Sequence, residues 1–182
     1  MKKTIVMLAT AVLAAGIAQG ATLYWLDGTV WANGGGGWSD TAPAPGPVYG
    51  PDNAIWNNAN ADRANFDSFG PRTVLLGSDI TTAFIQHNWW GSPFDFDLQG
   101  YTLTFSNTSG NAVSYNADDG TFTNGTIAFA DGVQVKAGNT INEAGITVSF
   151  NCDIDGSSNT LTKVNHGTLS LGGSNNVYGT TT

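Results

Sequence analysis

The stretch Leu161-Thr-Lys-Val-Asn-His-Gly-Thr-Leu-Ser-Leu-Gly-Gly-Ser-Asn-Asn-Val-Tyr-Gly-Thr-Thr-Thr182 decides the fold that this sequence predicts. Short blocks of strand-forming residues alternate in it with Gly and Asn, which favour turns. Its central block, Thr168-Leu-Ser-Leu171, has the form Thr, aliphatic, variable, large apolar. Side chains alternate between the two faces of a strand, so the second and fourth residues of this block share one face.

The same four-residue block recurs upstream. Two copies precede it at equal intervals, Thr147-Val-Ser-Phe150 and Thr126-Ile-Ala-Phe129. Two more lie further upstream at somewhat longer intervals, Thr102-Leu-Thr-Phe105 and Thr73-Val-Leu-Leu76. Repeats of about 20–25 residues are typical of units that stack on one another to bury a common core. The sequence therefore predicts an all-β fold, a right-handed parallel β-helix with three short strands per coil, and an antiparallel β-sandwich is the alternative.

The repeat spacing also predicts which side chains stack along the column. We expect two lines of apolar side chains inside it and one ladder of hydrogen-bonded turn asparagines at its corners. The first line contains Phe105, Phe129, Phe150 and Leu171, and the second contains Leu103, Ile127, Val148 and Leu169. The ladder contains Asn107, Asn151 and Asn175.

The C-terminal stretch resembles the autotransporter-associated β-strand repeat, which occurs in large secreted or surface-displayed bacterial passenger proteins. The positions that match the repeat are Leu161, Lys163, Gly167, Thr168, Leu169, Leu171, Gly173, Asn175, Gly179, Thr181 and Thr182. Asn165 replaces one glycine of the pattern, and Asn also adopts left-handed backbone conformations readily. Val177 stands where the family has Tyr, with Tyr178 displaced by one position. The resemblance implies a segment of a β-helical passenger protein.

Residues 1–20 have the layout of a secretory signal peptide. Lys2 and Lys3 form a positive start, an unbroken run of apolar and small residues extends from Ile5 to Ile17, and Ala18 and Gly20 supply small residues before the cleavage point. The run is shorter than the roughly 18–20 residues that a membrane span needs. We expect cleavage after Gly20, a mature chain that begins at Ala21 without a membrane-spanning segment, and a secreted protein or one on the bacterial surface at the outer membrane.

The region 21–72 is rich in aromatic residues, Gly and Pro. Four of the six tryptophans lie in it, at Trp25, Trp31, Trp38 and Trp56. The first coil of a solenoid has no neighbour on one side and needs a cap. We therefore expect an aromatic N-terminal cap over 21–72 and solenoid repeats over 73–182. Because the chain stops inside the repeat motif, we also expect it to be a fragment of a longer protein.

The charge balance excludes several kinds of partner. The chain has 14 acidic and 6 basic residues, which gives a net charge of −8, and two of the six basic residues lie in the leader. A surface this acidic repels nucleic acid and anionic lipid, and it would repel an acidic polysaccharide as well. The single cysteine, Cys152, cannot form an intramolecular disulfide, so packing and hydrogen bonds must hold the fold.

The titratable residues do not form a recognisable catalytic pattern. His87 and His166 stand apart, without a nearby nucleophile, which favours structural roles for both. Pairs of carboxylates occur at Asp95 and Asp97, at Asp118 and Asp119, and at Asp153 and Asp155. The first and third pairs would share a strand face, but the Gly and Glu spacing of a calcium loop is missing. We therefore expect no catalytic residue, no metal and no cofactor.

Two functions fit these observations. The first is an exported structural or adhesive surface protein without catalytic activity, which contacts surface glycans or other cell-surface proteins. The alternative is a carbohydrate-binding or polysaccharide-degrading β-helix module. In that case we expect Trp89 and Trp90 to stack on sugar rings, since aromatic faces pack well on them.

Overall fold

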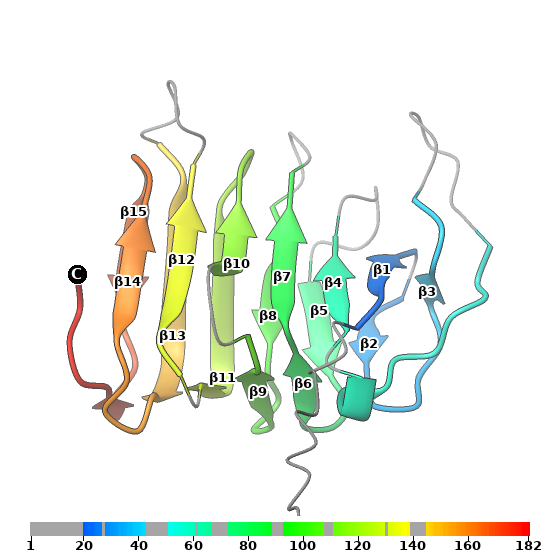
Figure 1. Cartoon of the computed structure of the whole chain (residues 1–182), viewed down its shortest axis with the longest axis horizontal. Coiled ribbons are helices and arrows are strands. Elements are labelled where there is room, and N and C mark those ends of the chain that lie inside the picture. The colour runs from blue at the N-terminus through cyan, green and yellow to red at the C-terminus, as the bar shows by residue number, and fades with distance from the viewer. Residues whose placement is uncertain are drawn as a thin grey trace, which may run out of the picture.

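The chain forms a column of coils in which strands from successive coils lie side by side (Figure 1). This computed structural model describes residues 20–26, 28–42, 51–60, 62–66, 73–88, 93–107, 111–129, 131–138 and 145–182. Among them, two long sheets run the length of the column, and a short 3-10 helix, η1 (Asn58–Asn60), precedes β4.

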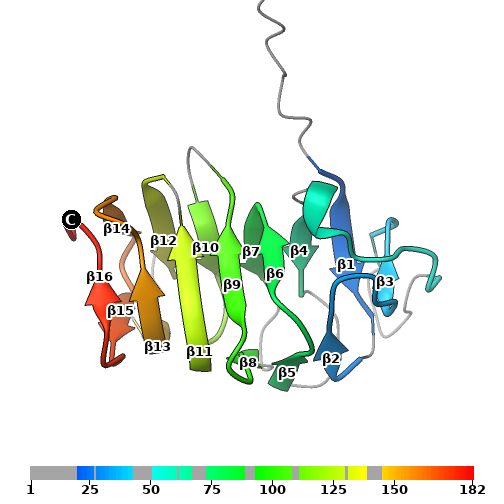
Figure 2. The same cartoon turned by 90° about the horizontal axis from the view of Figure 1, so that it is seen from below.

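Sheet A is formed by strands in the order β14-β12-β10-β7-β4-β1-β3. In that order their bounds are Leu161–Val164, Val133–Ala137, Asn111–Tyr115, Phe84–His87, Arg63–Asn65, Thr22–Trp25 and Trp38–Ser39. Sheet B follows the path β15-β13-β11-β8-β5-β2, with bounds Thr168–Leu171, Thr147–Asp155, Gly120–Phe129, Asp95–Asp97, Thr73–Leu76 and Val30–Trp31. The strands β16 (Asn176–Val177), β9 (Thr102–Phe105) and β6 (Ile80–Thr82) complete it. Figure 2 shows sheet B from below.

The strand ladders are parallel, which confirms the predicted β-helix. Among the described strands, the ladder between β1 and β3 is the one antiparallel exception. Two facing antiparallel sheets would require the opposite pairing, so the β-sandwich alternative is wrong. Each coil supplies one strand to sheet A and then passes through sheet B in two successive segments, which β11 and β13 join into one long strand each.

Alternating burial explains why the threonine blocks form strands. In β9 (Thr102–Phe105), Leu103 and Phe105 are buried while the residues between them are partly exposed, and β5 and the start of β13 follow the same alternation. The inward residues fill the core and the outward Thr side chains suit a half-exposed pleated surface. All the blocks read from the sequence thus lie in strands of sheet B.

The register of these blocks differs from the prediction. Thr147–Phe150 pairs with Thr168–Leu171 on one side, and on the other side its last three residues pair with Gly120, Thr121 and Phe122. Thr126–Phe129, by contrast, lies further along the coil, where it pairs with Thr102–Phe105 and with the end of β13. The blocks therefore occupy two different positions in the coil. They look alike in sequence because both positions need the same alternation of outward polar and inward apolar residues.

Two corrected columns of side chains follow from this register. Phe105 and Phe129 do not continue into Phe150 and Leu171, and Leu103 and Ile127 do not continue into Val148 and Leu169. The first column instead contains Val74, Phe96, Phe122, Phe150 and Leu171. The second contains Ile80, Leu103, Ile127 and Ile154.

Side chains that accept backbone N–H groups link the coils: Asn33 and Asn58 do so near the N-terminus, and aspartates do so further along the chain. Asn107, Asn151 and Asn175 do not form the predicted ladder: the Asn107 amide donates to the carbonyl of Asn111, Asn151 lies opposite Thr123, and Asn175 bonds to Asp153. Backbone N–H groups donate instead to carboxylates of the preceding coil, 22 to 28 residues earlier. The donor and acceptor pairs are Thr102 to Asp79, Thr121 to Asp95, Thr147 to Asp119 and Asn175 to Asp153.

The aromatic residues of the N-terminal region form the core of its first coil. Trp25, Trp31, Trp38 and Trp56 are each 1% exposed or less. Their rings contact one another at centroid distances of 4.7–5.5 Å, and Phe66 joins the cluster. The strands β1, β2 and β4 extend the two sheets through this region, and the antiparallel β3 covers the end of sheet A. The aromatic cap is thus confirmed, and it is continuous with the sheets.

Candidate functional site

The predicted sugar-stacking residues do not form a described site. Trp89 and Trp90 lie outside the described residues. The four described tryptophans are buried in the cap, so their ring faces contact other aromatic rings and are not open to a ligand. The described part of the Trp-rich region therefore supplies core packing rather than a stacking platform.

The two histidines have different surroundings. His87 is fully buried in β7, with its ring against Phe94 and Tyr115. Its Nδ1 lies 3.0 Å from the carbonyl oxygen of Phe66, and because a carbonyl only accepts, this nitrogen carries the hydrogen. His166 is exposed after β14. The structural role predicted for His87 agrees with its buried contacts.

Two of the three predicted carboxylate pairs share strand faces, and their carboxylates accept hydrogen bonds from the backbone and from neighbouring amides. Asp95 and Asp97 flank the buried Phe96 on the outer face of β8. Asp95 accepts from the N–H of Thr121, and Asp97 accepts from Gln99 and from the Asn124 amide. Asp153 and Asp155 stand in the same relation in β13. Among the residues that the structure describes, no cluster of three or more His, Cys, Asp or Glu could hold a metal ion.

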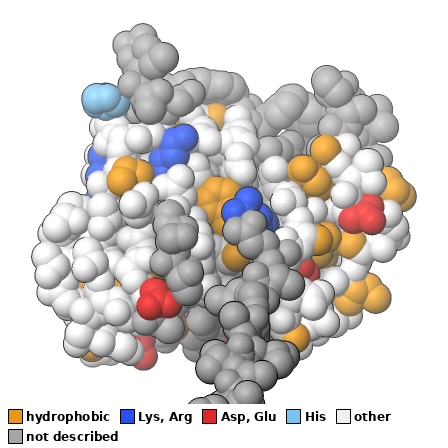
Figure 3. Space-filling view, in the orientation of Figure 1, with side chains coloured by type: hydrophobic (Ala, Val, Ile, Leu, Met, Phe, Trp, Pro, Cys, Tyr) orange, Lys and Arg blue, Asp and Glu red, His pale blue; other side chains and the backbone are white. Residues whose placement is uncertain are grey.

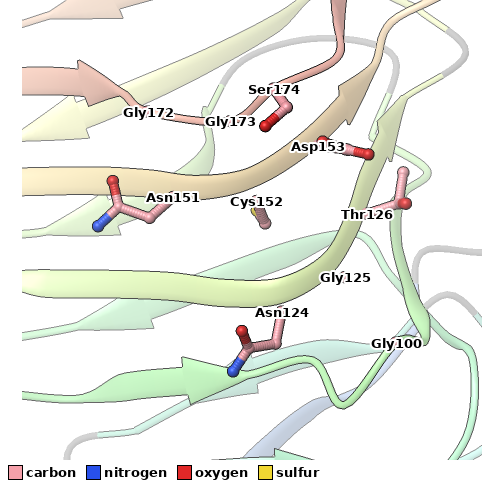
Figure 4. A pocket seen from close by; sticks show the side chains of 10 residues that line it. All are labelled: Gly100, Asn124, Gly125, Thr126, Asn151, Cys152, Asp153, Gly172, Gly173 and Ser174. Atoms are coloured by element: carbon pink, nitrogen blue, oxygen red, sulfur yellow. The ribbon is translucent and has the colours of Figure 1, made fainter.

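A polar groove lies where sheet B bends between its two segments (Figure 4). It has a volume of about 370 Å³ and spans four successive coils. Its lining consists of glycines, amides, hydroxyls, a thiol and one carboxylate: Gly100, Asn124, Gly125, Thr126, Asn151, Cys152, Asp153, Gly172, Gly173 and Ser174. We call this hollow the corner groove.

The glycines of the corner groove are required by the close approach of neighbouring coils. A Cβ on Gly173 would overlap the Cys152 carbonyl oxygen, and one on Gly125 would lie 2.5 Å from the Tyr101 carbonyl oxygen. Neither position can therefore hold a larger residue without moving the backbone. The missing side chains also leave the corner hollow, which opens the groove between the amides of Asn124 and Asn151, both exposed.

The electrostatics of the groove favour neutral polar or cationic ligands. Hydrogen bonds from the side chain and backbone of Asn175 hold the pKa of Asp153 below its ordinary value, so this carboxylate is ionised at neutral pH. Burial raises the pKa of the neighbouring Cys152 thiol to about 12, with the charge of Asp153 adding to the effect. The thiol therefore stays protonated and is a poor nucleophile. The groove offers amide and hydroxyl hydrogen bonds beside one negative charge.

Sequence reasoning missed the corner groove, although a signal for it was present. Asn124-Gly125 and Gly172-Gly173 are strong turn dipeptides. Both dipeptides line the same corner of the column, where they contribute little side-chain volume. The wrong register hid this, because it placed the block after Gly125 in line with the block before Gly172.

The charged side chains are sparse on the face shown in Figure 3, where most of the described surface is uncharged polar side chain or backbone.

Within the described ranges, no helix is long and apolar enough to cross a bilayer. Comparison of the sequence with protein-family models gave no match, and searches of curated proteins and of solved structures gave no similar protein.

Proposed function

We propose that this chain is an exported structural or adhesive protein, a β-helical segment of the autotransporter passenger type that acts by reach and surface contact. The observation that carries this proposal is the regular stacking of its coils. Successive coils repeat three features. Each adds parallel strands to the two sheets, coils are linked by aspartates that accept a backbone N–H of the next coil, and glycines at the corners leave room for the neighbouring backbone.

Such an architecture suits a mechanical role. Each coil contacts its neighbours alone, so stability is close to a sum of coil and interface contributions, and coils can be added without redesigning the rest. Extended solenoids present long, regular faces to other molecules. Export is supported by the sequence of residues 1–20, and the resemblance of 161–182 to a passenger repeat supports display at a bacterial surface.

The corner groove favours a second candidate function, the binding of a neutral glycan. Sugars are recognised by hydrogen bonds to their hydroxyls, and the exposed amides of Asn124 and Asn151 with the hydroxyl of Ser174 supply donors and acceptors along the groove. The acidic Asp153 would disfavour a polyuronate at this place. This candidate is compatible with an adhesive role and differs from it in requiring a defined ligand.

Export is tested by producing the full chain in a Gram-negative bacterial host and following the protein through cell fractions. We expect a shortened chain outside the inner membrane. A charge placed in the apolar run of the leader, as in Leu13→Arg, should retain the full-length chain in the cytoplasm. A chain that stays uncleaved and cytoplasmic without this substitution would contradict the proposal.

Surface contact and glycan binding are separated by a glycan array probed with the purified mature chain. Binding that is lost in the Asn124→Ala plus Asn151→Ala variant would assign the groove as a glycan site. Binding lost instead in the Trp89→Ala plus Trp90→Ala variant would favour the tryptophan pair. Absence of glycan binding, together with adhesion of cells to beads coated with the mature chain, would favour contact with surface proteins.

A further inference from the structure

The backbone nitrogen of Ala21 donates a hydrogen bond of 2.9 Å to a carboxylate oxygen of Asp62. Asp62 is 3% exposed and directly precedes β4, so this carboxylate belongs to the coil that stacks on β1. Ala21 is held from its other side as well, because its carbonyl oxygen accepts the N–H of Arg63 at 2.8 Å. The next residue, Thr22, then begins β1 and pairs with Arg63 in the parallel ladder of β1 and β4. Both backbone polar groups of Ala21 are thus bonded to residues at the start of β4.

The same residue follows the cleavage point that the leader predicts. Ala18 and Gly20 occupy the small-residue positions before the cut, so hydrolysis would separate Gly20 from Ala21. In that reaction a signal peptidase breaks the peptide bond with water: the hydroxyl goes to the Gly20 carbonyl carbon, and Ala21 keeps an amine. A terminal amine has a pKa of about 7.7–8.0, so it binds a proton and carries a positive charge at neutral pH.

We propose that Asp62 is the acceptor for the mature N-terminus, so that removal of the leader converts the Ala21–Asp62 hydrogen bond into a partly buried ion pair that fastens the first coil to the next one. The inference rests on the proposed export and adds a role for a named residue in maturation.

The surroundings of Asp62 support this role. Burial raises the pKa of this carboxyl, and the hydrogen bonds that it accepts from Ala21, Asn60 and Asn57 offset the effect in part. A buried carboxylate whose partners are neutral is poorly compensated, and a cation in place of the Ala21 amide would compensate it. The nearest basic side chain along the chain, Arg63, is directed to the ring of Phe84, with its guanidinium carbon 5.8 Å from the ring centroid.

The other aspartates that link coils provide the matched control. Asp95 accepts the N–H of Thr121 at 3.0 Å, in a similar backbone-to-carboxylate bond, but Thr121 lies inside the chain and never carries a terminal amine. Processing therefore changes the charge opposite Asp62 and leaves the charge opposite Asp95 unchanged.

The first measurement is the N-terminal residue of the exported protein, determined by mass spectrometry. We expect Ala21. An exported chain with a different first residue would overturn the inference while leaving export intact, and a chain retained uncleaved in the cytoplasm would overturn both.

The second measurement is the thermal unfolding of chains with different N-termini. The chain that begins at Ala21 should unfold about 2–4 °C above the same chain acetylated at Ala21, and also above a chain that begins at Gly20, where the amine is displaced by one residue. The Asp62→Asn substitution should abolish these differences, whereas Asp95→Asn should preserve them. Equal unfolding temperatures for the three chains, or a difference that persists with Asp62→Asn, would overturn the inference. The comparison of Ala21 and Gly20 starts needs no substitution, so it remains decisive if Asp62→Asn prevents folding.

Discussion

Gly167, Gly173 and Gly179 show at the scale of single residues why the C-terminal motif contains glycine at these intervals. A Cβ at these positions would overlap the carbonyl oxygens of Ile146, Cys152 and Ser158 respectively. Each of these carbonyls belongs to the preceding coil, so the three glycines mark successive corners at which one coil passes close to the next. Space, rather than backbone conformation, excludes other residues there.

The Gly173→Ala substitution tests this explanation. The added methyl would overlap the Cys152 carbonyl, so we expect a loss of about 1–3 kcal/mol in the free energy of unfolding, measured by chemical denaturation. The control is Gly145→Ala, because a Cβ on Gly145 meets no atom within 4 Å. If both substitutions changed stability equally, close approach would not be the reason for the glycine.

The ionisation of Asp153 gives the fold a dependence on acid. Hydrogen bonds from Asn175 lower its pKa in the folded state, so its contribution is present above the ordinary Asp pKa of about 3.9 and is lost as the pH falls through the folded value. We expect stability to fall as the pH drops below that ordinary value, and to fall less in Asp153→Asn. Denaturation curves at several pH values measure this, and Asn175→Ala should flatten the profile in the same way. An unchanged pH profile in both variants would remove Asp153 from this account.

Buried indole nitrogens offer a third test at this scale. Among the described residues, the Nε1 atoms of Trp25, Trp31 and Trp38 have no hydrogen-bond partner, whereas that of Trp56 donates to Asn58 at 3.1 Å. Replacement by Phe removes a similar volume at Trp31 and Trp56, but it breaks a hydrogen bond at Trp56 alone. We expect Trp56→Phe to cost about 1 kcal/mol more than Trp31→Phe in equilibrium unfolding. The reverse order would show that the unpaired indoles have partners in solution.

At the scale of elements, the aromatic column of sheet B connects the cap to the later coils. Phe122 in β11 lies at 4.8 Å from Phe96 in a stacked arrangement and at 5.3 Å from Phe150 in an edge arrangement, measured between ring centroids. Phe96 in turn contacts Trp31 and Phe66 of the aromatic cap. Removal of one ring therefore weakens the contacts of two neighbouring coils.

The Phe122→Ala substitution should accordingly cost about 3–5 kcal/mol, the usual effect of removing a fully buried ring. Hydrogen exchange should rise first in β8 and the first half of β13, which flank the gap, and later in β1. The control is Phe84→Ala, because Phe84 is half-buried and faces outward beside Arg63. A uniform rise in exchange along the column would contradict the nearest-neighbour description.

Elements were easier to predict from this sequence than their alignment. Thr73–Leu76, Thr102–Phe105 and Thr168–Leu171 are strands with the bounds that their patterns indicate. Alternation is a local property, so short segments reveal it. The same alternation serves both segments of sheet B, so no local feature of Thr126–Phe129 shows that it pairs with Asp153–Asp155 rather than with Thr147–Phe150.

The candidate site was hidden for the same reason. The corner groove combines residues of four coils, and its members meet only in the correct register. The aromatic cap was predictable because solenoids need a covered end and because the tryptophans are concentrated near Ala21. The roles of Asp79, Asp95 and Asp119 as links between coils were not predictable, since each acceptor lies a full coil away from its donor.

At the scale of the whole molecule, the acidic composition has two consequences. Aspartates hold backbone N–H groups at the corners, and they contribute to a net charge of −8, which gives rise to repulsion between two such chains. The single cysteine, Cys152, is buried and free, so hydrogen bonds and packing rather than a disulfide join the coils. The column is therefore defined by its register, from which the core, the links and the corner groove all follow.

The most direct test of this register uses pairs of spin labels at outward positions of sheet B, in a Cys152→Ser background. Thr121 and Ser149 are paired neighbours, as are Ala128 and Asp155, so labels at either pair of sites should lie on adjacent strands about 5 Å apart in backbone and show strong dipolar broadening. Labels at Ala128 and Ser149, which alignment of the threonine blocks alone would pair, should show little. Broadening in the Ala128–Ser149 pair and its absence in the Thr121–Ser149 pair would contradict the account.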